Sequence, residues 1–581
     1  MKKLTMFLVI AAIIVGAICI GVMGMGLGWA GYQSSAGPEA SLSQYVPAGA
    51  VLYLQAKDFS SLLSDWNGSA QKQAWQMSSN YEVFSRSRLL LRLRDAGKQF
   101  ATAAGLPPDM DFVTQVAGGQ SALALYDIGK LQFLYITRLP SANSMQGQLW
   151  QTRSKFESRT AGGVTFYLRR DPESDREVAF AVAGDYLLLA TREDLMAGAL
   201  QLIAGGTNKD RSIEGDPWWA RAVAATGSVG DLRMILNLDK LVPSPYFRSY
   251  WVQQNVTDMK KYSAAVSDLF RSGQEYREER VLLKKVAGDP SSAGVPEDVN
   301  DLVRLVPEGA GFYKAEGCPS VESCLTPLER KILAPRAASY PASPEQIAPQ
   351  AQLTSGETGA SSDLETRIDQ APMQHSSDDR GPSALKAILQ KYRVRAVLQV
   401  QSTGRDHEGV FVKIHSAIAL AGRSNWDEAA ARAATAEFVT PSLTASQLGV
   451  GWKQTNDYWE LDGLRGLLLA VSGEYLVIAD DPALLEGMLA NMNRKVESKP
   501  SVVVAGFDHR HERENFARLA TVVDRPDMSP AGIPRSQQQP QFFSENIASL
   551  SSTLAGVSSE KLVVRDAGEK VLQTVTYEWS R

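Results

Sequence analysis

The chain opens with a long apolar stretch. Strongly apolar residues run from Leu4 to about Trp29 without a charged side chain, directly behind Lys2 and Lys3. A helix of roughly 20 apolar residues crosses about 30 Å of hydrocarbon, and basic residues ahead of such a span favour a cytoplasmic N-terminus. The pattern predicts a transmembrane signal anchor at residues 1–30 and a spacer at 31–44. It predicts a single-pass protein of the cytoplasmic membrane whose bulk is extracytoplasmic (periplasmic).

Cleavage of this segment is the alternative to a retained anchor. Gly28-Trp29-Ala30 and Ser34-Ser35-Ala36 resemble the small-residue sites at which signal peptides are cut. The apolar core of a cleaved signal is usually only about 7–15 residues long, so the length of this stretch favours retention. Either outcome exports the remainder of the chain.

Beyond the spacer, apolar runs of strand length alternate with helical patterns. Val178–Val182 and Tyr186–Ala190 are separated by Gly184-Asp185, which predicts a tight hairpin with a return strand buried on both faces. In Pro482–Met492 the apolar positions recur at helical spacing, which predicts a helix packed on the sheet. The polar stretch Tyr246–Val286 predicts a long helix or a helical hairpin. The fold class expected is α+β, with mostly antiparallel sheets packed with helices.

Two segments of the first half return in the second half in the same order. Ala181–Leu200 matches Ala470–Leu489 at nine of twenty positions, including the signature residues Gly184/Gly473 and Tyr186/Tyr475. Val46–Tyr53 matches Val306–Tyr313 in the same way. The offsets are 470 − 181 = 289 and 306 − 46 = 260, so the second half holds about 29 additional residues between its two segments. We expect two related repeats behind the transmembrane helix.

The repeat and the composition together predict the domain bounds. Residues 334–382 are rich in Ala, Pro, Ser, Gln and Asp, and too poor in apolar residues to offset the entropy of ordering, which predicts a disordered insertion. The predicted domains are a first α+β repeat at 45–242, a helical connector at 243–300, the start of the second repeat at 301–333, the insertion at 334–382, and the remainder of the second repeat with the C-terminal strands at 383–581.

Charge and cysteine content limit the classes of partner and the compartment. A net charge of −4 and a pI near 5.9 argue against a general nucleic-acid surface. Cys318 and Cys324 lie six residues apart, and in an oxidising compartment two such thiols would form a local disulfide. A metal pair is the less favoured alternative, because no nearby histidine or second cysteine pair completes it. Cys19, within the span, is expected to be a small packing residue.

The opening Val-Pro-Xaa-Xaa-Ala-Xaa-Xaa-Tyr strand and the Gly-Asp/Glu-Tyr-Leu signature that leads into a Leu-rich helix resemble an uncharacterised bacterial family of exported proteins. Members of that domain-of-unknown-function family carry an N-terminal membrane segment. The resemblance covers most of residues 42–524 in two copies. It implies a membrane-attached, extracytoplasmic bacterial protein, and it implies no catalytic residue.

Candidate chemistry is sparse along the chain. His509 and His511 flank Arg510 after an apolar strand, so they are weak metal candidates if they share a strand face; a polar helix start is the alternative. Ser383 and Lys386 match a Ser-Xaa-Xaa-Lys spacing, yet the motifs that accompany it in serine acyl enzymes are missing and Ser383 is placed to cap a helix. The sequence gives no catalytic residue and no cofactor motif, so we expect neither.

Recurring acids and tryptophans have simple structural interpretations. Asp185 and Glu474 recur as a pair of carboxylates, but their place beside Gly184 and Gly473 predicts a turn position rather than acid–base work. Trp218-Trp219 and Trp459 would line either an apolar groove or the core.

Two functions follow as hypotheses. The first is a non-enzymatic binding or scaffolding protein of the bacterial cell envelope, attached to the membrane through its N-terminal helix, with an envelope protein or a lipid as partner and no nucleic acid. The alternative is a periplasmic hydrolase with an unrecognised active site between the two repeats. The missing catalytic motifs and the duplication favour the first hypothesis.

Overall fold

The computed structural model divides the chain into two compact units. Unit 1 comprises Met1–Ala293 and Asp508–Arg581, and unit 2 comprises Gly294–Phe507. The structure describes residues 41–77, 81, 88–106, 112–144, 147–172, 175–205, 209–245, 259–272, 275–285, 298–333, 384–405, 412–443, 451–455, 457–461, 466–495, 500–515 and 556–579.

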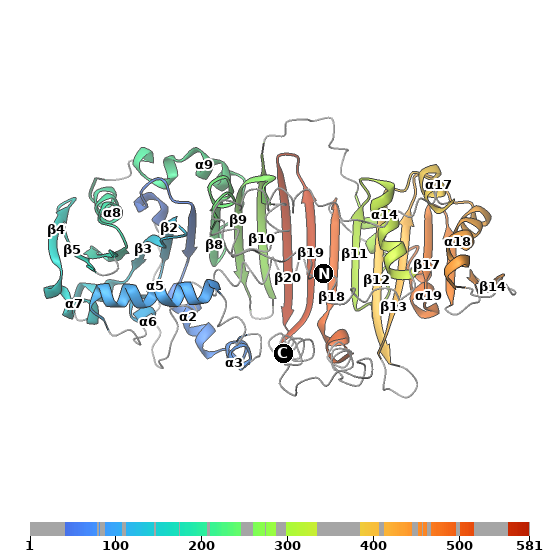
Figure 1. Ribbon diagram of the computed structural model, residues 1–581, viewed down its shortest axis with the longest axis horizontal. Coiled ribbons are helices and arrows are strands. Elements are labelled where there is room, and N and C mark those ends of the chain that lie inside the picture. Colours follow the sequence, from blue (N-terminus) through green and yellow to red (C-terminus); the bar gives the residue numbers. More distant parts are fainter. Residues whose placement is uncertain are drawn as a thin grey trace, which may run out of the picture. The chain divides into compact units, whose positions relative to one another are not determined.

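The strands of unit 1 pair antiparallel throughout, and their order differs from their order along the chain (Figure 1). From one edge onward the order is β4 (Glu157–Ala161), β5 (Val164–Arg170), β6 (Glu177–Ala183), β7 (Tyr186–Ala190), β3 (Gln132–Arg138), β2 (Ser121–Asp127), β1 (Leu52–Ala56), β8 (Leu232–Asn237), β9 (Tyr262–Arg271), β10 (Glu275–Lys284), β20 (Lys570–Trp579) and β19 (Val557–Asp566).

Unit 2 has the same kind of strand order. Its strands run β14 (Trp452–Thr455), β15 (Tyr458–Leu461), β16 (Leu467–Ser472), β17 (Tyr475–Ala479), β13 (Val412–Ala421), β12 (Ala396–Arg405), β11 (Phe312–Gly317) and β18 (Val503–Asp508). The hairpin that carries the Gly-Asp/Glu-Tyr signature lies between β5 and β3 in unit 1 and between the corresponding strands, β15 and β13, in unit 2.

Helices cover both faces of the strands because the central strands are apolar on both sides. The helices of unit 1 are α2 (Phe59–Gly68), α3 (Ala70–Gln76), α5 (Arg88–Ala104), α6 (Phe112–Val116), α7 (Gln148–Gln151), α8 (Glu193–Gly205), α9 (Pro217–Ala224) and α10 (Leu238–Leu241). Leu188 of β7 lies in one core with Met196 of α8, whereas its neighbour Leu187 lies in a second core with Ala103 of α5. Alternate residues of one strand thus enter opposite cores, as continuous apolar character predicts.

The helices of unit 2 are α13 (Asn300–Val303), α14 (Val321–Leu328), α17 (Ala384–Lys391), α18 (Glu428–Leu443) and α19 (Pro482–Ala490). Residues of α14, α17 and α18 share a core with Ile418 of β13 and Leu476 of β17. α19 packs on β13, β16 and β17. Pro482 occupies its first turn, as predicted, and the Asp481 side chain accepts a hydrogen bond from the Leu484 amide.

A repeated glycine allows each signature helix to approach a repeated proline. A Cβ atom at Gly198 of α8 would lie 3.0 Å from Pro47 Cγ, and one at Gly487 of α19 would lie 2.7 Å from Pro307 Cβ. Both prolines belong to the opening segments at residues 46–53 and 306–313. The two matches found in the sequence are therefore in contact with each other within each unit.

The predicted fold class is wrong. The described strands belong to one 20-stranded antiparallel sheet, not to two separate α+β repeats. None of the helices in the described residues is long and apolar enough to cross a membrane. The predicted anchor at 1–30, residues 31–40 of the predicted spacer, and the predicted insertion at 334–382 lie outside the described residues.

The helical connector predicted at 243–300 is also wrong where the structure describes it. Residues 262–271 and 275–284 form the hairpin of β9 and β10, because each strand carries apolar residues that the core buries, among them Val266 and Val281, and this burial outweighs the polar composition that suggested a helix. The C-terminal strands, grouped by sequence with the second repeat, belong to unit 1, where β20 pairs with β10.

Candidate functional site

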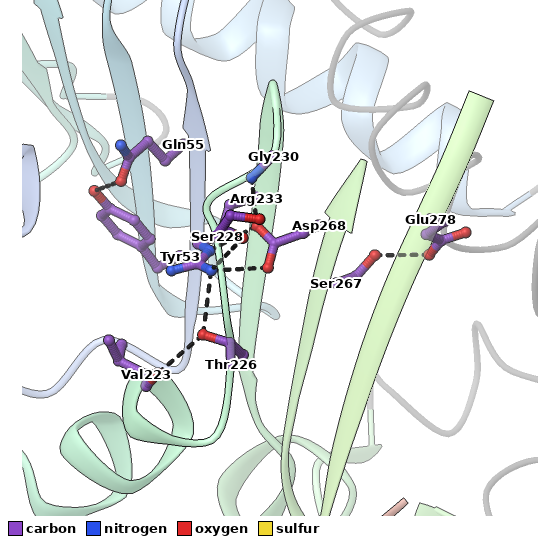
Figure 2. A network of polar contacts seen from close by, with 10 residues as sticks. All are labelled: Tyr53, Gln55, Val223, Thr226, Ser228, Gly230, Arg233, Ser267, Asp268 and Glu278. Carbon is purple, nitrogen blue, oxygen red and sulfur yellow. Dashed lines mark hydrogen bonds and ion pairs between the residues drawn. The ribbon is translucent and has the colours of Figure 1, made fainter. Parts of the chain in front are cut away.

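A buried ion pair links β8 and β9 of unit 1 (Figure 2). Arg233 and Asp268 are direct cross-strand partners with side chains only 6% and 4% exposed. Arg233 donates from Nε to Asp268 Oδ1 at 2.7 Å and from a terminal nitrogen to Oδ2 at 2.8 Å. The Gly230 amide donates to the same carboxylate at 2.9 Å, and Arg233 also reaches the Thr226 hydroxyl at 3.2 Å. Such a bidentate, fully hydrogen-bonded pair fixes the two strands in register.

A second group of polar side chains lies on the neighbouring strand β10. Glu278 accepts hydrogen bonds from Ser267 Oγ at 2.6 Å and from two nitrogens of Arg280 at 2.5 Å each. Glu278 and Arg280 are both buried. Because they are two residues apart on one strand, their side chains share a face of the sheet. Burial, followed by the carboxylates of Glu560 and Glu278, raises the pKa of the Tyr577 phenol on the adjacent β20.

The two candidate metal histidines do not meet. His509 Nε2 lies 3.8 Å from Glu560 of β19, whereas His511 Nδ1 lies 2.8 Å from the buried Glu512. Both histidines belong to the helical segment at residues 509–515, not to a strand, so their side chains diverge. Across the described residues, no group of three or more His, Cys, Asp or Glu side chains is placed to hold a metal ion.

The signature residues have the same backbone conformation in both units but different surroundings. Gly184 and Gly473 both adopt φ = +57°, the left-handed region that favours glycine in a tight turn. Asp185 and Glu474 are exposed at these turns, as a turn position predicts. Tyr186 packs against the Tyr45 ring at a centroid distance of 5.6 Å. Tyr475 instead lies among charged groups.

Tyr475, Asp301, Arg304 and Arg395 form a half-exposed polar cluster at one end of the unit 2 strands, which we call the Tyr475 cluster. The Tyr475 hydroxyl donates to Asp301 Oδ2 at 2.7 Å and accepts from Arg304 at 3.2 Å. Asp301 also forms an ion pair with Arg395, which donates from its other terminal nitrogen to the Asp298 carbonyl at 3.0 Å. Burial and the hydrogen bond to Asp301 raise the pKa of Tyr475 to about 12, so the phenol stays neutral at physiological pH. This cluster is the candidate functional site.

Three different elements position these side chains. Arg395 precedes β12, Tyr475 begins β17, and Asp301 and Arg304 belong to α13 and its C-cap. The Arg395 amide bonds to the carbonyl of Ala421, which is the register partner of Tyr475, so the adjoining ends of β12, β13 and β17 bring these side chains together. The sequence identified Tyr475 but missed Asp301, Arg304 and Arg395. Position 304 is matched by Gln44 in the first unit, and that difference between the two halves was the available signal.

Cys318 and Cys324 form a disulfide with a Cα–Cα distance of 5.5 Å. The bridge lies at the start of α14, where Ser320 and Ser323 form a capping box, and Cys324 is fully buried. It therefore fastens a helix start to the end of β11 within unit 2.

The remaining candidates have structural partners. Lys386 Nζ lies 2.5 Å from Glu322, and Ser383 lies outside the described residues. Trp219 packs edge-on against buried Tyr53 at 4.9 Å. The guanidinium of Arg432 lies 3.5 Å above the centre of the Trp459 ring. Trp219 belongs to the core, which is one of the two readings that the sequence allowed.

Comparison with known proteins adds little to this geometry. No family model matches the chain, and no curated protein matches it. Among solved structures, crystal form I of TP0453 is similar at 12% identity and a TM-score of 0.23 over 44% of this chain and 82% of that chain. Crystal form III of TP0453 is similar at 12% identity and a TM-score of 0.24 over 47% of this chain and 89% of that chain. Similarity at this level carries no argument about function.

Proposed function

We propose that this protein is a non-enzymatic binding or scaffolding protein of the bacterial cell envelope, attached to the cytoplasmic membrane by its N-terminal apolar segment. The observation that carries the proposal is how the buried charges of unit 1 are used. Arg233 and Asp268 form a hydrogen-bonded pair across β8 and β9, and Arg280 and Glu278 form one along β10. Buried pairs of this kind, with their hydrogen bonds satisfied, rigidify the sheet, and a rigid sheet suits a binding scaffold.

The disulfide supports the extracytoplasmic part of the proposal. Structural disulfides persist in oxidising compartments and are rare in the cytosol of mesophiles. The bridge between Cys318 and Cys324 fits a periplasmic location for unit 2. The apolar stretch from Leu4 to Trp29 supports a membrane attachment ahead of it.

Thiol trapping in cells tests the location. Cells are quenched in acid and alkylated before and after reduction, and the labelling of Cys318 and Cys324 is measured by mass spectrometry. We expect both to be labelled only after reduction. Labelling of both without reduction would place unit 2 in a reducing compartment and contradict the proposal.

Crosslinking in native membranes tests the binding role. We expect a reproducible crosslinked partner, protein or lipid, that is recovered with the full chain in mild detergent. The matched control is the chain with unit 1 destabilised by Asp268→Asn. A pure chain that recovers no partner and hydrolyses an envelope component would instead favour the hydrolase.

A further inference from the structure

Within the Tyr475 cluster, Arg304 is the charged residue that forms no ion pair with another member of the cluster. Arg395 is paired with Asp301, and the single polar partner that the described residues give Arg304 is the Tyr475 hydroxyl. Its Cζ lies 5.4 Å from the centre of the Tyr475 ring. Within the described part of the chain, no carboxylate lies within 4.0 Å of its guanidinium nitrogens, and its Nε is buried without an acceptor. A guanidinium has five N–H donors, and the described residues accept a hydrogen bond from only one of the Arg304 nitrogens.

The fold does not require this charge. In unit 1 the equivalent turn places Tyr186 against the Tyr45 ring, and Gln44 stands at the position that corresponds to Arg304. The same hairpin, with the same glycine conformation, forms there without the charges. A half-buried cation without an anion carries a desolvation cost, and unit 1 shows that the backbone can avoid that cost.

We propose that Arg304, held in place by its hydrogen bond to the Tyr475 hydroxyl, binds the carboxylate of a ligand. The planar guanidinium matches a carboxylate in a two-bond geometry. A monoanion suits the site because Arg304 supplies one unpaired positive charge and Asp301 stands close by, so that a dianionic phosphate would be repelled. The carboxylate belongs either to a small organic acid or to the C-terminal end of a peptide. This inference deepens the proposed binding role and rests on it.

Chemical protection of Arg304 tests the site in the full chain purified in mild detergent. Phenylglyoxal modifies arginine, and the extent of modification at each arginine is measured by mass spectrometry. We expect acetate, compared with chloride at equal ionic strength, to slow the modification of Arg304 severalfold. Arg170, whose ion pair with Asp175 is exposed, is the internal control and should be unaffected. Equal slowing at both arginines, or at neither, would overturn the proposal.

A peptide distinguishes the two sources of the carboxylate. Binding of Ala-Ala-Ala and of its C-terminal amide is measured by ligand-observed NMR. Binding of the free acid and not of the amide supports the site. Tighter binding of the free acid than of acetate assigns it to peptide ends, whereas equal binding assigns it to small acids.

Variants then assign the binding to Arg304. Arg304→Gln should raise the Kd of the free acid at least about tenfold, since hydrogen bonds to a charged group are lost. Tyr186→Phe, a change at the signature tyrosine of unit 1 that leaves the Tyr475 cluster intact, should leave that Kd unchanged. Equal affinity in wild type and Arg304→Gln would refute the assignment, as would binding only to inorganic phosphate or to phosphatidylglycerol vesicles. Persistence of the crosslinked partner in Arg304→Gln would overturn this site and leave the general binding role intact.

Discussion

Removing the negative charge of Asp268 should open the β8–β9 pairing more easily than any exposed substitution. In Asp268→Asn the side chain keeps its shape, but one oxygen that accepts from Arg233 becomes an amide that donates. Arg233, 6% exposed, is then left without an anion. Breaking a buried ion pair from one side costs roughly 3–5 kcal/mol. The acceptor of the Gly230 amide, at 2.9 Å, is also weakened.

Hydrogen exchange of peptides that cover β8 and β9 measures this effect in the full chain. A loss of roughly 3–5 kcal/mol in local opening free energy corresponds to exchange about a hundredfold to several-thousandfold faster, at tenfold per 1.36 kcal/mol. The control is Asp175→Asn, which breaks the ion pair with Arg170 whose side chains are 62% and 76% exposed and should cost under about 1 kcal/mol. The double change Arg233→Met with Asp268→Leu should restore much of the protection, because no charge is left unpaired. If Asp268→Asn exchanges no faster than Asp175→Asn, the pair does not stabilise these strands.

Three further predictions concern single features. Gly487→Ala should lower the free energy of unfolding, measured in urea, by about 1–3 kcal/mol, because its Cβ would lie 2.7 Å from Pro307 Cβ. Gly198→Ala should be near neutral, because its Cβ would lie 3.0 Å from the end of the Pro47 ring and alanine gains up to about 1 kcal/mol over glycine in a helix. Equal effects of the two changes would contradict the packing argument. Tyr475, with its pKa raised to about 12, binds its proton more tightly in the folded than in the unfolded chain, so its stabilising contribution is complete below pH 10 and is lost as the pH rises toward 12. Tyr475→Phe should therefore reduce the fall in the free energy of unfolding between pH 10 and 12, measured by urea unfolding. An equal fall in the variant and the wild type would refute the raised pKa. Cys318→Ser and Cys324→Ser should each lower the free energy of unfolding by roughly 2 kcal/mol, because each removes the disulfide that closes the short loop between them. Two very different losses in the same unfolding assay would mean that the packing of Cys324, rather than loop closure, dominates.

Sequence patterns located the signature hairpins because their information is local. The strand–turn–strand of β6 and β7 depends on Gly184 and on apolar runs of strand length, and both are visible in a short window. The same holds for the start of α19 at Pro482. Sheet organisation is different, since it is set by pairings between distant strands that no local pattern encodes.

The β9–β10 hairpin shows why polar composition misled. Glu278, Arg280 and Asp268 look like solvent-facing helix residues in the sequence, but the structure buries them as partners of one another or of neighbouring strands. The residue type alone does not distinguish a buried charge that is paired within a sheet from a charge exposed to water. The Tyr475 cluster was only half visible for the same reason: Asp301 and Tyr475 are 174 residues apart and meet through tertiary structure alone.

The pairing of β10 with β20 has a consequence for how the protein is made. Val281 of β10 is the register partner of Leu572 of β20, so β10 lacks this neighbouring strand until nearly three hundred further residues have been synthesised. During that interval β10 is an unpaired edge strand, which is a template for unwanted strand addition. Contacts so distant in sequence also form slowly. The edge of β10 is therefore open to unwanted strand pairing while unit 2 is being synthesised, and we expect a chain truncated before β19 to aggregate through that edge.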